Sequence, residues 1–224
     1  MADLTPFMNV NMAYPGIEIA PEISLLKEYL KHMESGIEAA SQSYIKAGEL
    51  EFSGCEYDEY RHVYETAESR LPDLIRSQAV VPIHALFEES VSRLLTFCQS
   101  QEKKNVALGD IKERTQIRKY NKYLRSELNF DFQFDETLKR DFKKLTAVRN
   151  CVAHSNGDPF SMRPSQRTYI LKLIQNENGL NHGCHRLSVN SLFLYSSMDF
   201  VEKYVKQLMK HIEARYGYYW KHSD

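Results

Sequence analysis

The sequence predicts an all-α fold, a helical bundle of four or five long helices with a small β-hairpin insertion at about 167–189. Two observations support this prediction. Apolar residues recur at intervals of three and four in several long stretches, which is the period of an amphipathic helix. The 224 residues include only nine glycines and seven prolines, too few for the many turns of an all-β protein.

The first long helix is expected at 22–48. Ile23, Leu26 and Leu30 open a stripe of apolar residues along one helical face. Pro21 suits the first position of a helix, where a missing backbone N–H breaks no hydrogen bond. The helix is therefore expected to follow an irregular N-terminal arm.

The second long helix is expected at 83–99, where Ile83 and Phe87 begin another apolar face. Pro72 and Pro82 come before it. Proline lacks an N–H, and its ring strikes the carbonyl of the preceding turn. Each of these two prolines is therefore expected to end or kink a helix.

The third long helix, at 136–154, has signals at both ends. Asp135 is expected to cap its first turn, and the turn residues of "SNGDP" follow it. Two short β-like runs around an Asn/Gly-rich turn predict the hairpin at about 167–189. The last helix is expected at 198–215 and is stopped by Gly217.

These elements are expected to form one domain at 21–217, between an arm at 1–20 and a tail at 218–224. The longest apolar runs, such as "AVVPI", are far too short to cross a bilayer. The N-terminal residues lack the pattern of a secretory signal. The cysteines are scattered without a CxxC pair: Cys55, Cys98, Cys151 and Cys184. We therefore expect a cytoplasmic protein with free thiols and no membrane partner.

Charge is unevenly distributed along the chain. Residues 1–100 contain 7 basic and 16 acidic residues, whereas residues 101–150 contain 13 basic and 8 acidic ones. A basic second half is consistent with a polyanionic partner and equally with an uneven solvated surface. The sequence has no P-loop, GxGxxG or GxSxG motif, and therefore gives no support to nucleotide-dependent transferase or serine-hydrolase chemistry.

The most basic stretch, 111–126, contains six cations and one glutamate. Tyr120 and Tyr123 are interleaved with the cations, a pattern suited to an RNA backbone with stacked bases. A solvated surface helix is the alternative interpretation. The candidate RNA-binding residues are Lys112, Arg114, Arg118, Lys119, Lys122 and Arg125.

"AVRNCVAHSNG", residues 147–157, places a charged side chain within an apolar helical stripe. On a helical wheel with Leu138 at zero, Arg149 falls at about 20°, among the apolar positions. A guanidinium stays charged, so it needs a polar partner or an opening to water. Asn150 and His154 are four residues apart and share a neighbouring face.

"RNCVAH", residues 149–154, resembles the R-x4-6-H motif of the HEPN superfamily in its R-polar-x3-H form. The resemblance implies an all-α bundle that often dimerises and, in many members, a metal-independent endoribonuclease. It makes Arg149, Asn150 and His154 the candidate catalytic residues, with no metal and no cofactor. The tyrosine that follows the histidine in some members is absent, since Ser155 and Asn156 stand there.

These residue types suit RNA cleavage. A histidine can take the proton of a 2′-OH, and an arginine can hold the phosphate as its charge grows. The resemblance implies a homodimer whose composite cleft supplies a second acid–base group, with 2′,3′-cyclic phosphate and 5′-hydroxyl ends as products. It also suggests a toxin or an anti-phage or stress effector restrained by an antitoxin or regulatory protein. The alternative is a catalytically silent HEPN-like module that binds RNA, a nucleotide or a partner protein.

Other residues also allow a functional interpretation. Glu88 and Glu89 are expected to be solvated helix charges, and the alternative is that one pairs with Arg149. "HGCH", residues 182–185, matches no familiar zinc spacing. Cys151 is expected to be a buried structural thiol, and His84 a residue at the edge of the core.

Overall fold

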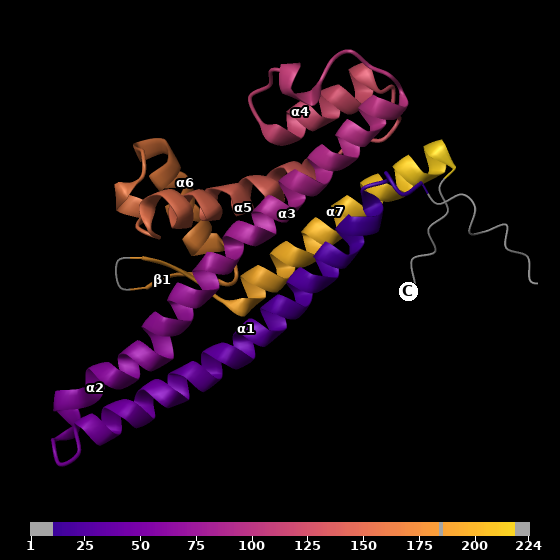
Figure 1. The fold of residues 1–224 in the computed structure, drawn as a ribbon. Coiled ribbons are helices and arrows are strands. Elements are labelled where there is room, and N and C mark those ends of the chain that lie inside the picture. The colour runs from indigo at the N-terminus through magenta and orange to yellow at the C-terminus, as the bar shows by residue number, and fades with distance from the viewer. Residues whose placement is uncertain (1–10, 184–185, 218–224) are drawn as a thin grey trace, which may run out of the picture. The chain divides into compact units, whose positions relative to one another are not determined.

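The structure is a computed structural model that describes residues 11–183 and 186–217, and most of these residues are helical (Figure 1). The main elements in chain order are α1 (Gly16–Glu51), α2 (Tyr57–Glu65), α3 (Leu71–Gln101), α4 (Gln116–Lys122), α5 (Glu136–Ser155), α6 (Pro164–Asn176), β1 (Leu180–His182), β2 (Leu187–Val189) and α7 (Ser191–Tyr216). Within the described residues, α1, α3, α5 and α7 are the long helices, and β1 and β2 form the hairpin. The all-α prediction with a small hairpin is confirmed.

The chain divides into two compact units. Among the described residues, unit 1 comprises 11–24, 85–142 and 199–217, and unit 2 comprises 25–84 and 143–198. The boundaries fall inside the four long helices, so the domain expected at 21–217 spans both units. The expectations for residues 1–10 and for the tail at 218–224 concern residues outside the described part of the chain.

An aromatic cluster forms the core of unit 1. The ring of Phe87 lies 4.8 Å from that of Phe142, 6.0 Å from Phe134 and 6.5 Å from Tyr120, measured between centroids. All four side chains are buried. Tilted aromatic pairs at these distances bury large apolar areas and add a modest attraction between rings. This cluster holds the start of α5 against α3 and α4.

α1 begins earlier than expected, at Gly16 rather than at 22, and passes through Pro21. The apolar stripe already starts at Ile19, which is completely buried. Tyr14 is also buried, and its hydroxyl donates to Glu213 Oε1 at 3.1 Å, which anchors the start of the helix on α7. Tertiary packing thus outweighs the local preference for proline at a first helical position.

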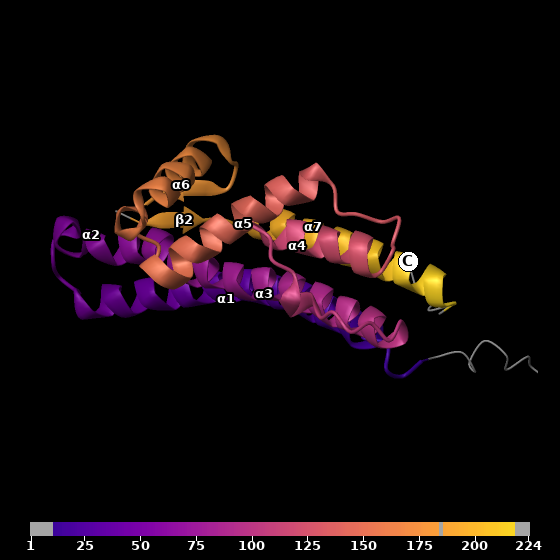
Figure 2. The same cartoon turned by 90° about the horizontal axis from the view of Figure 1, so that it is seen from above.

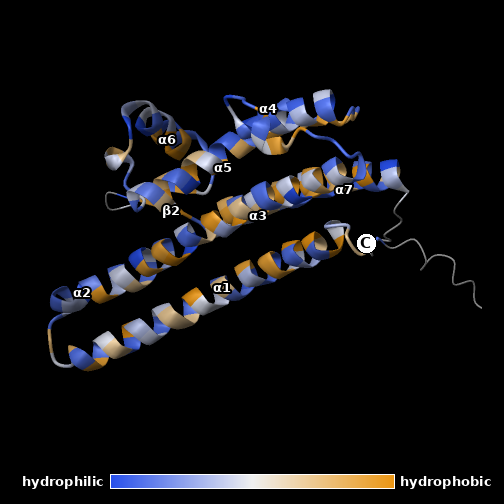
Figure 3. Ribbon diagram, turned by 45° about the horizontal axis from the view of Figure 1, so that its top comes forward, coloured by the Kyte–Doolittle hydropathy of each residue, from blue (hydrophilic) through white to orange (hydrophobic). Residues whose placement is uncertain are grey.

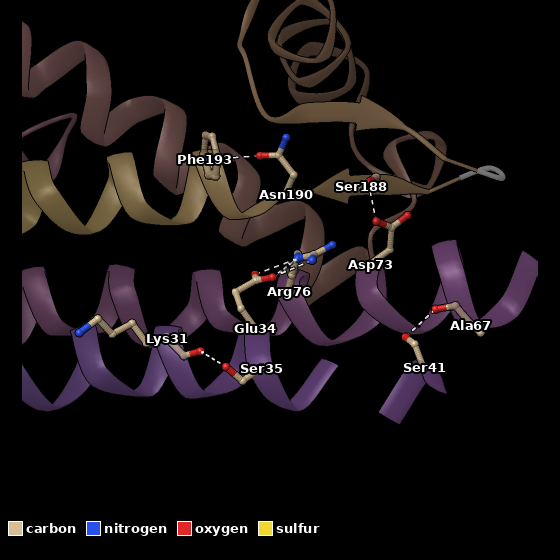
Figure 4. A network of polar contacts seen from close by, with 10 residues as sticks. All are labelled: Lys31, Glu34, Ser35, Ser41, Ala67, Asp73, Arg76, Ser188, Asn190 and Phe193. Carbon is tan, nitrogen blue, oxygen red and sulfur yellow. Dashed lines mark hydrogen bonds and ion pairs between the residues drawn. The ribbon is translucent and has the colours of Figure 1, made fainter. Parts of the chain in front are cut away.

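In unit 2, α1 lies beside the run from α2 to α3 with the opposite chain direction (Figures 1 and 2). A Cβ on Gly48 would come within 2.5 Å of Val63 Cγ1, so only glycine permits this close approach. Arg76 forms a bidentate ion pair with Glu34, with its Nε at 2.9 Å and Nη2 at 2.7 Å from the carboxylate oxygens (Figure 4). Figure 3 shows apolar and polar residues alternating around α1, as an amphipathic helix requires.

Neither proline of the second helical region ends a helix. Pro72 follows a π-helical turn at Thr66–Arg70, where the N–H of Leu71 bonds to the carbonyl of Thr66. Such a wider turn relieves the clash between a proline ring and the preceding carbonyl. Pro82 lies inside α3, which continues to Gln101. The second long helix therefore starts at Leu71 instead of 83.

The hairpin is shorter than expected. Its strands pair antiparallel, with Leu180 opposite Val189 and His182 opposite Leu187. The first β-like run belongs to α6, which has Pro164 at its start. Ile170 and Leu173 are the buried residues of that helix, and their spacing of three is helical rather than alternating. The prediction of a strand from about 167 was therefore wrong.

Within residues 11–183 and 186–217, no helix has both the length and the apolar character needed to cross a membrane.

Candidate active site

The motif residues occupy the last two turns of α5, which ends in a defined turn. Asn156 and Gly157 have positive φ angles of 49° and 76°. The N–H of Gly157 donates to the carbonyl of Cys151 at 2.9 Å. This bond spans six residues, one more than the 6→1 bond of a Schellman motif, and it closes a wider turn in which two successive residues have positive φ. It sets the end of the helix directly after the motif, in agreement with the predicted boundary.

Arg149 is the centre of a small polar cluster. Its Nη1 donates to Oδ1 of Asn150 at 2.9 Å and lies 3.4 Å from Nε2 of His154. The Arg149 side chain is half-buried, and His154 is exposed. The guanidinium therefore has both the polar partners and the opening to water that its place on an apolar stripe requires. The three candidate catalytic residues lie together at one accessible helix end.

Buried apolar side chains support this cluster from below. Val148, Cys151 and Val152 are buried, as are Leu138, Phe142 and Leu145 earlier in the stripe. Burial raises the pKa of the Cys151 thiol to about 12, and the nearby charge of Asp158 acts in the same direction. Cys151 therefore stays protonated near neutral pH and is not a nucleophile, as expected for a structural thiol.

His84 is a neighbour of the cluster, a relation that the sequence did not predict. Its ring is only 1% exposed, and its Nε2 lies 3.1 Å from Oγ1 of Thr146. Thr146 precedes Arg149 by three residues and so lies one turn away on the same side of α5. His84 was expected at the edge of the core, whereas the structure buries it completely against the motif helix.

Burial and the charge of Arg149 both act on His84. The pKa of His84 is lowered from 6.5 to about 4. Desolvation by burial is the larger cause, and the positive charge of Arg149 is the smaller one. His84 is therefore neutral near pH 7, and it offers the guanidinium a polar neighbour without a competing charge. The helical period alone could not have identified this role, because His84 and Thr146 are 62 residues apart in sequence.

The predicted RNA-binding residues belong to unit 1, whereas the motif belongs to unit 2. Lys112 and Arg114 are exposed in the segment before α4, and Lys119 is half-buried. Arg118, Lys122 and Arg125 line one cleft of about 380 Å³. The structure thus brings three of the six cations together.

Tyr120 and Tyr123 are not available to stack on bases. Both are completely buried, and each hydroxyl bonds to a backbone carbonyl, that of Glu88 at 3.4 Å and that of Val106 at 2.8 Å. The expectation of stacked bases was therefore wrong for these tyrosines. The alternation of tyrosines and cations in the sequence is that of an amphipathic helix, and the aromatic rings lie on its buried face.

A cavity of about 520 Å³ lies at the same end of α5 in unit 2, but neither Arg149 nor His154 lines it. Val152, Asn156 and Gly157 contribute from α5 and its turn, and Arg186 and Leu187 contribute from the hairpin. The hollow is therefore separate from the polar cluster.

The remaining candidates add no catalytic group. Glu88 is half-buried and Glu89 is exposed, and their pairing with Arg149 stays a prediction. Of "HGCH", Cys184 and His185 lie outside the described residues, and His182 is exposed. No group of three metal-ligating side chains occurs in residues 11–183 and 186–217.

The chain matches no model of a known protein family, no curated protein and no solved structure.

Proposed function

We propose that this chain is a HEPN-like, metal-independent endoribonuclease in which Arg149 and His154 perform the chemistry. One observation supports the proposal above the others: Nη1 of Arg149 reaches both Asn150 and His154 at an accessible helix end. An R-polar-x3-H motif on a buried helix would not bring these groups together at the surface. The proposal depends on this convergence.

Arg149 supplies the fixed charge in this mechanism. The planar guanidinium donates two parallel hydrogen bonds to non-bridging phosphate oxygens, whose charge grows in the transition state. Asn150 Oδ1 accepts from Nη1 at 2.9 Å and so orients the fork. His84 is neutral beside it, because of its low pKa, and adds no repulsion toward the phosphate.

His154 supplies the base. Its Nε2 takes the proton of the 2′-OH, the 2′-oxygen forms a bond to phosphorus, and the bond from phosphorus to the 5′-oxygen breaks. The leaving 5′-oxygen receives a proton from a second acid. The products are a 2′,3′-cyclic phosphate and a 5′-hydroxyl, and no electron transfer or metal enters the balance.

The second acid in this proposal is the protonated His154 of another copy. His84 is buried, so one chain offers a single accessible histidine at the cluster, whereas cleavage needs a base and an acid at once. A two-fold homodimer is the commonest arrangement that places two copies of one residue in a shared cleft. The proposed site is therefore complete only in the dimer.

The proposed cellular role is that of a toxin or an anti-phage or stress effector held in check by an antitoxin or regulatory protein. Expression in a host should then arrest growth, and His154→Ala should relieve the arrest. A module that binds RNA, a nucleotide or a protein without cleaving RNA would leave growth unaffected by this substitution.

The decisive experiment is RNA cleavage by the purified protein in the presence of EDTA. Single-stranded or loop RNA should be cut, and DNA of the same sequence should not, because DNA lacks the 2′-OH nucleophile. His154→Ala should lower the rate by about 10²-fold or more, the usual contribution of a positioned acid or base. His32→Ala is the matched control, since His32 is an exposed histidine on α1 of the same unit.

His154 is exposed, so its substitution should leave the thermal unfolding curve unchanged. A folded His154→Ala protein that cuts RNA as fast as the parent would rule out the proposed chemistry. That result would assign the motif to structure and favour the binding module.

A further inference from the structure

A polar cleft lies along α4 in unit 1, within the basic stretch where the sequence suggested RNA-binding residues. It is a shallow, open cleft of about 380 Å³. We call it the α4 cleft. Its lining residues are Glu113, Arg118, Asn121, Lys122, Arg125, Ser126, Gln133 and Lys139.

The charges of the α4 cleft are strongly one-sided. Four cations line it, and Glu113 is the one carboxylate among its lining side chains. Glu113 lies 3.2 Å from Lys122, and Lys139 pairs with Glu136 at 2.6 Å. Arg118 and Arg125 are exposed and have no carboxylate partner among the described residues. Two guanidinium groups thus remain available to an anion.

The backbone beneath these cations is held firmly. Asn121 is buried, its Nδ2 donates to the carbonyl of Phe134 at 2.8 Å, and its Oδ1 accepts from the N–H of Phe134 at 2.9 Å. This pair of bonds ties α4 to the segment that carries Gln133, another lining residue. Tyr120 and Tyr123 are anchored in the core on the inner side of the same helical run. The cations are therefore presented from a preorganised frame.

The spacing of the cations suits a chain of phosphates. Arg118 and Lys122 are four residues apart on α4 and share one helical face. Arg125 follows in the π-helical turn Tyr123–Glu127 and lines the same cleft. A second hollow of about 450 Å³ shares Arg125 and Gln133 with the α4 cleft and extends the groove toward Asn129. Such a groove can contact more than one phosphate of a strand.

We propose that the α4 cleft is a docking site for the phosphodiester backbone of single-stranded RNA, apart from the residues that carry the cleavage chemistry. Arginine forks match phosphate oxygens bidentately. With both tyrosines buried, the cleft contacts the backbone without reading or stacking bases. Binding is therefore independent of base sequence, and single-stranded DNA binds the cleft about as well as RNA. This proposal rests on the proposed ribonuclease function in one respect: that function identifies RNA, and not DNA, as the natural ligand.

Fluorescence anisotropy with a labelled single-stranded DNA oligonucleotide tests the cleft without any cleavage. The test variant is Arg118→Gln/Arg125→Gln. The control is Lys103→Gln/Lys210→Gln, which removes the same charge from exposed positions in the same unit that do not line the cleft. All four side chains are exposed, and thermal unfolding checks that both variants fold.

The cleft variant should bind about tenfold or more weakly at moderate salt, and the slope of log affinity against log salt should fall by about 1.4 for two lost phosphate contacts. The control should keep most of the affinity and the slope. Equal losses in both variants, or no loss in either, would overturn the proposal. Competition by an acidic peptide as effective as an oligonucleotide of equal charge would also overturn it, in favour of a protein partner.

The outcomes separate this proposal from the ribonuclease. If the cleft variant binds more weakly and the parent protein does not cleave RNA, the docking proposal stands and the ribonuclease proposal is wrong. If RNA cleavage depends on His154 and the cleft variant binds as well as the parent, the ribonuclease proposal stands and the docking proposal is wrong.

Discussion

The Nη1 atom of Arg149 lies 3.4 Å from Nε2 of His154, across the last two turns of α5. A guanidinium only donates, so a hydrogen bond here requires a neutral imidazole with its proton on Nδ1. This is the form in which Nε2 can accept a proton. In the proposed mechanism, Arg149 Nη1 donates to the phosphate of bound RNA instead of to Nε2 of His154. Nε2 is then free to accept the proton of the 2′-OH.

The first prediction separates the charge of Arg149 from its shape. Arg149→Ala should lower the RNA cleavage rate by about 10²-fold, the usual effect of removing a donor to developing charge. Arg149→Lys should recover only part of that loss, because a point charge cannot bond to Asn150 and to two phosphate oxygens in one plane. Initial rates with saturating RNA in EDTA measure both effects.

Arg149 is half-buried, so thermal unfolding must accompany these rates. Full activity in a folded Arg149→Lys protein would show that the planar fork is not needed. Full activity in a folded Arg149→Ala protein would remove Arg149 from the mechanism altogether.

Helix α5 shows how much of the site could be predicted from the sequence. Its span was expected at 136–154 and is found at Glu136–Ser155. Local signals account for this agreement: Asp135 Oδ1 accepts from the N–H of Leu138 at 2.7 Å as the expected cap, and Gly157 supports the closing turn. Where boundary residues and the apolar period agree, the sequence is sufficient.

The surroundings of the motif could not be predicted in this way, because they depend on contacts between distant segments. His84 is on α3 and meets α5 through Thr146, a relation that no local pattern encodes. Tyr120 and Tyr123 have the same period as the cations around them, and only packing decides which face turns inward. The sequence pattern therefore could not predict which face of a helix is buried, or which distant residues pack against that face.

A second prediction concerns acid stability. His84 has a pKa of about 4 in the folded protein against 6.5 for an ordinary histidine, so the unfolded chain binds the proton more readily between these values. Stability should therefore be complete above about pH 6.5 and fall as the pH drops toward 4. The shift corresponds to a loss of about 3 kcal/mol in the free energy of unfolding. Urea unfolding at pH 7.5 and at pH 4.5 measures it.

His84→Gln provides the comparison, because glutamine can still bond to Thr146 and does not titrate. This variant should lose clearly less stability than the parent between the two pH values. His32→Gln, at an exposed position, should behave like the parent. An identical loss in His84→Gln and the parent would exclude His84 as the source of the acid sensitivity.

The last prediction tests whether two copies share one site. If His154 of one copy is the base and His154 of the other is the acid, a dimer with a single intact histidine is inactive. Adding His154→Ala protein to the parent should then inhibit it. After subunit exchange, the activity per parent molecule should fall in proportion to the mole fraction of parent protein, because only parent–parent dimers cut RNA. His32→Ala added in the same excess should leave the activity per intact His154 unchanged, since its dimers retain both copies of His154.

Sedimentation velocity at tens of micromolar should show the dimer that a shared site needs. A monomer at that concentration would exclude a site shared by two copies. Parent activity that persists in a large excess of exchanged His154→Ala would mean that each chain cleaves RNA by itself.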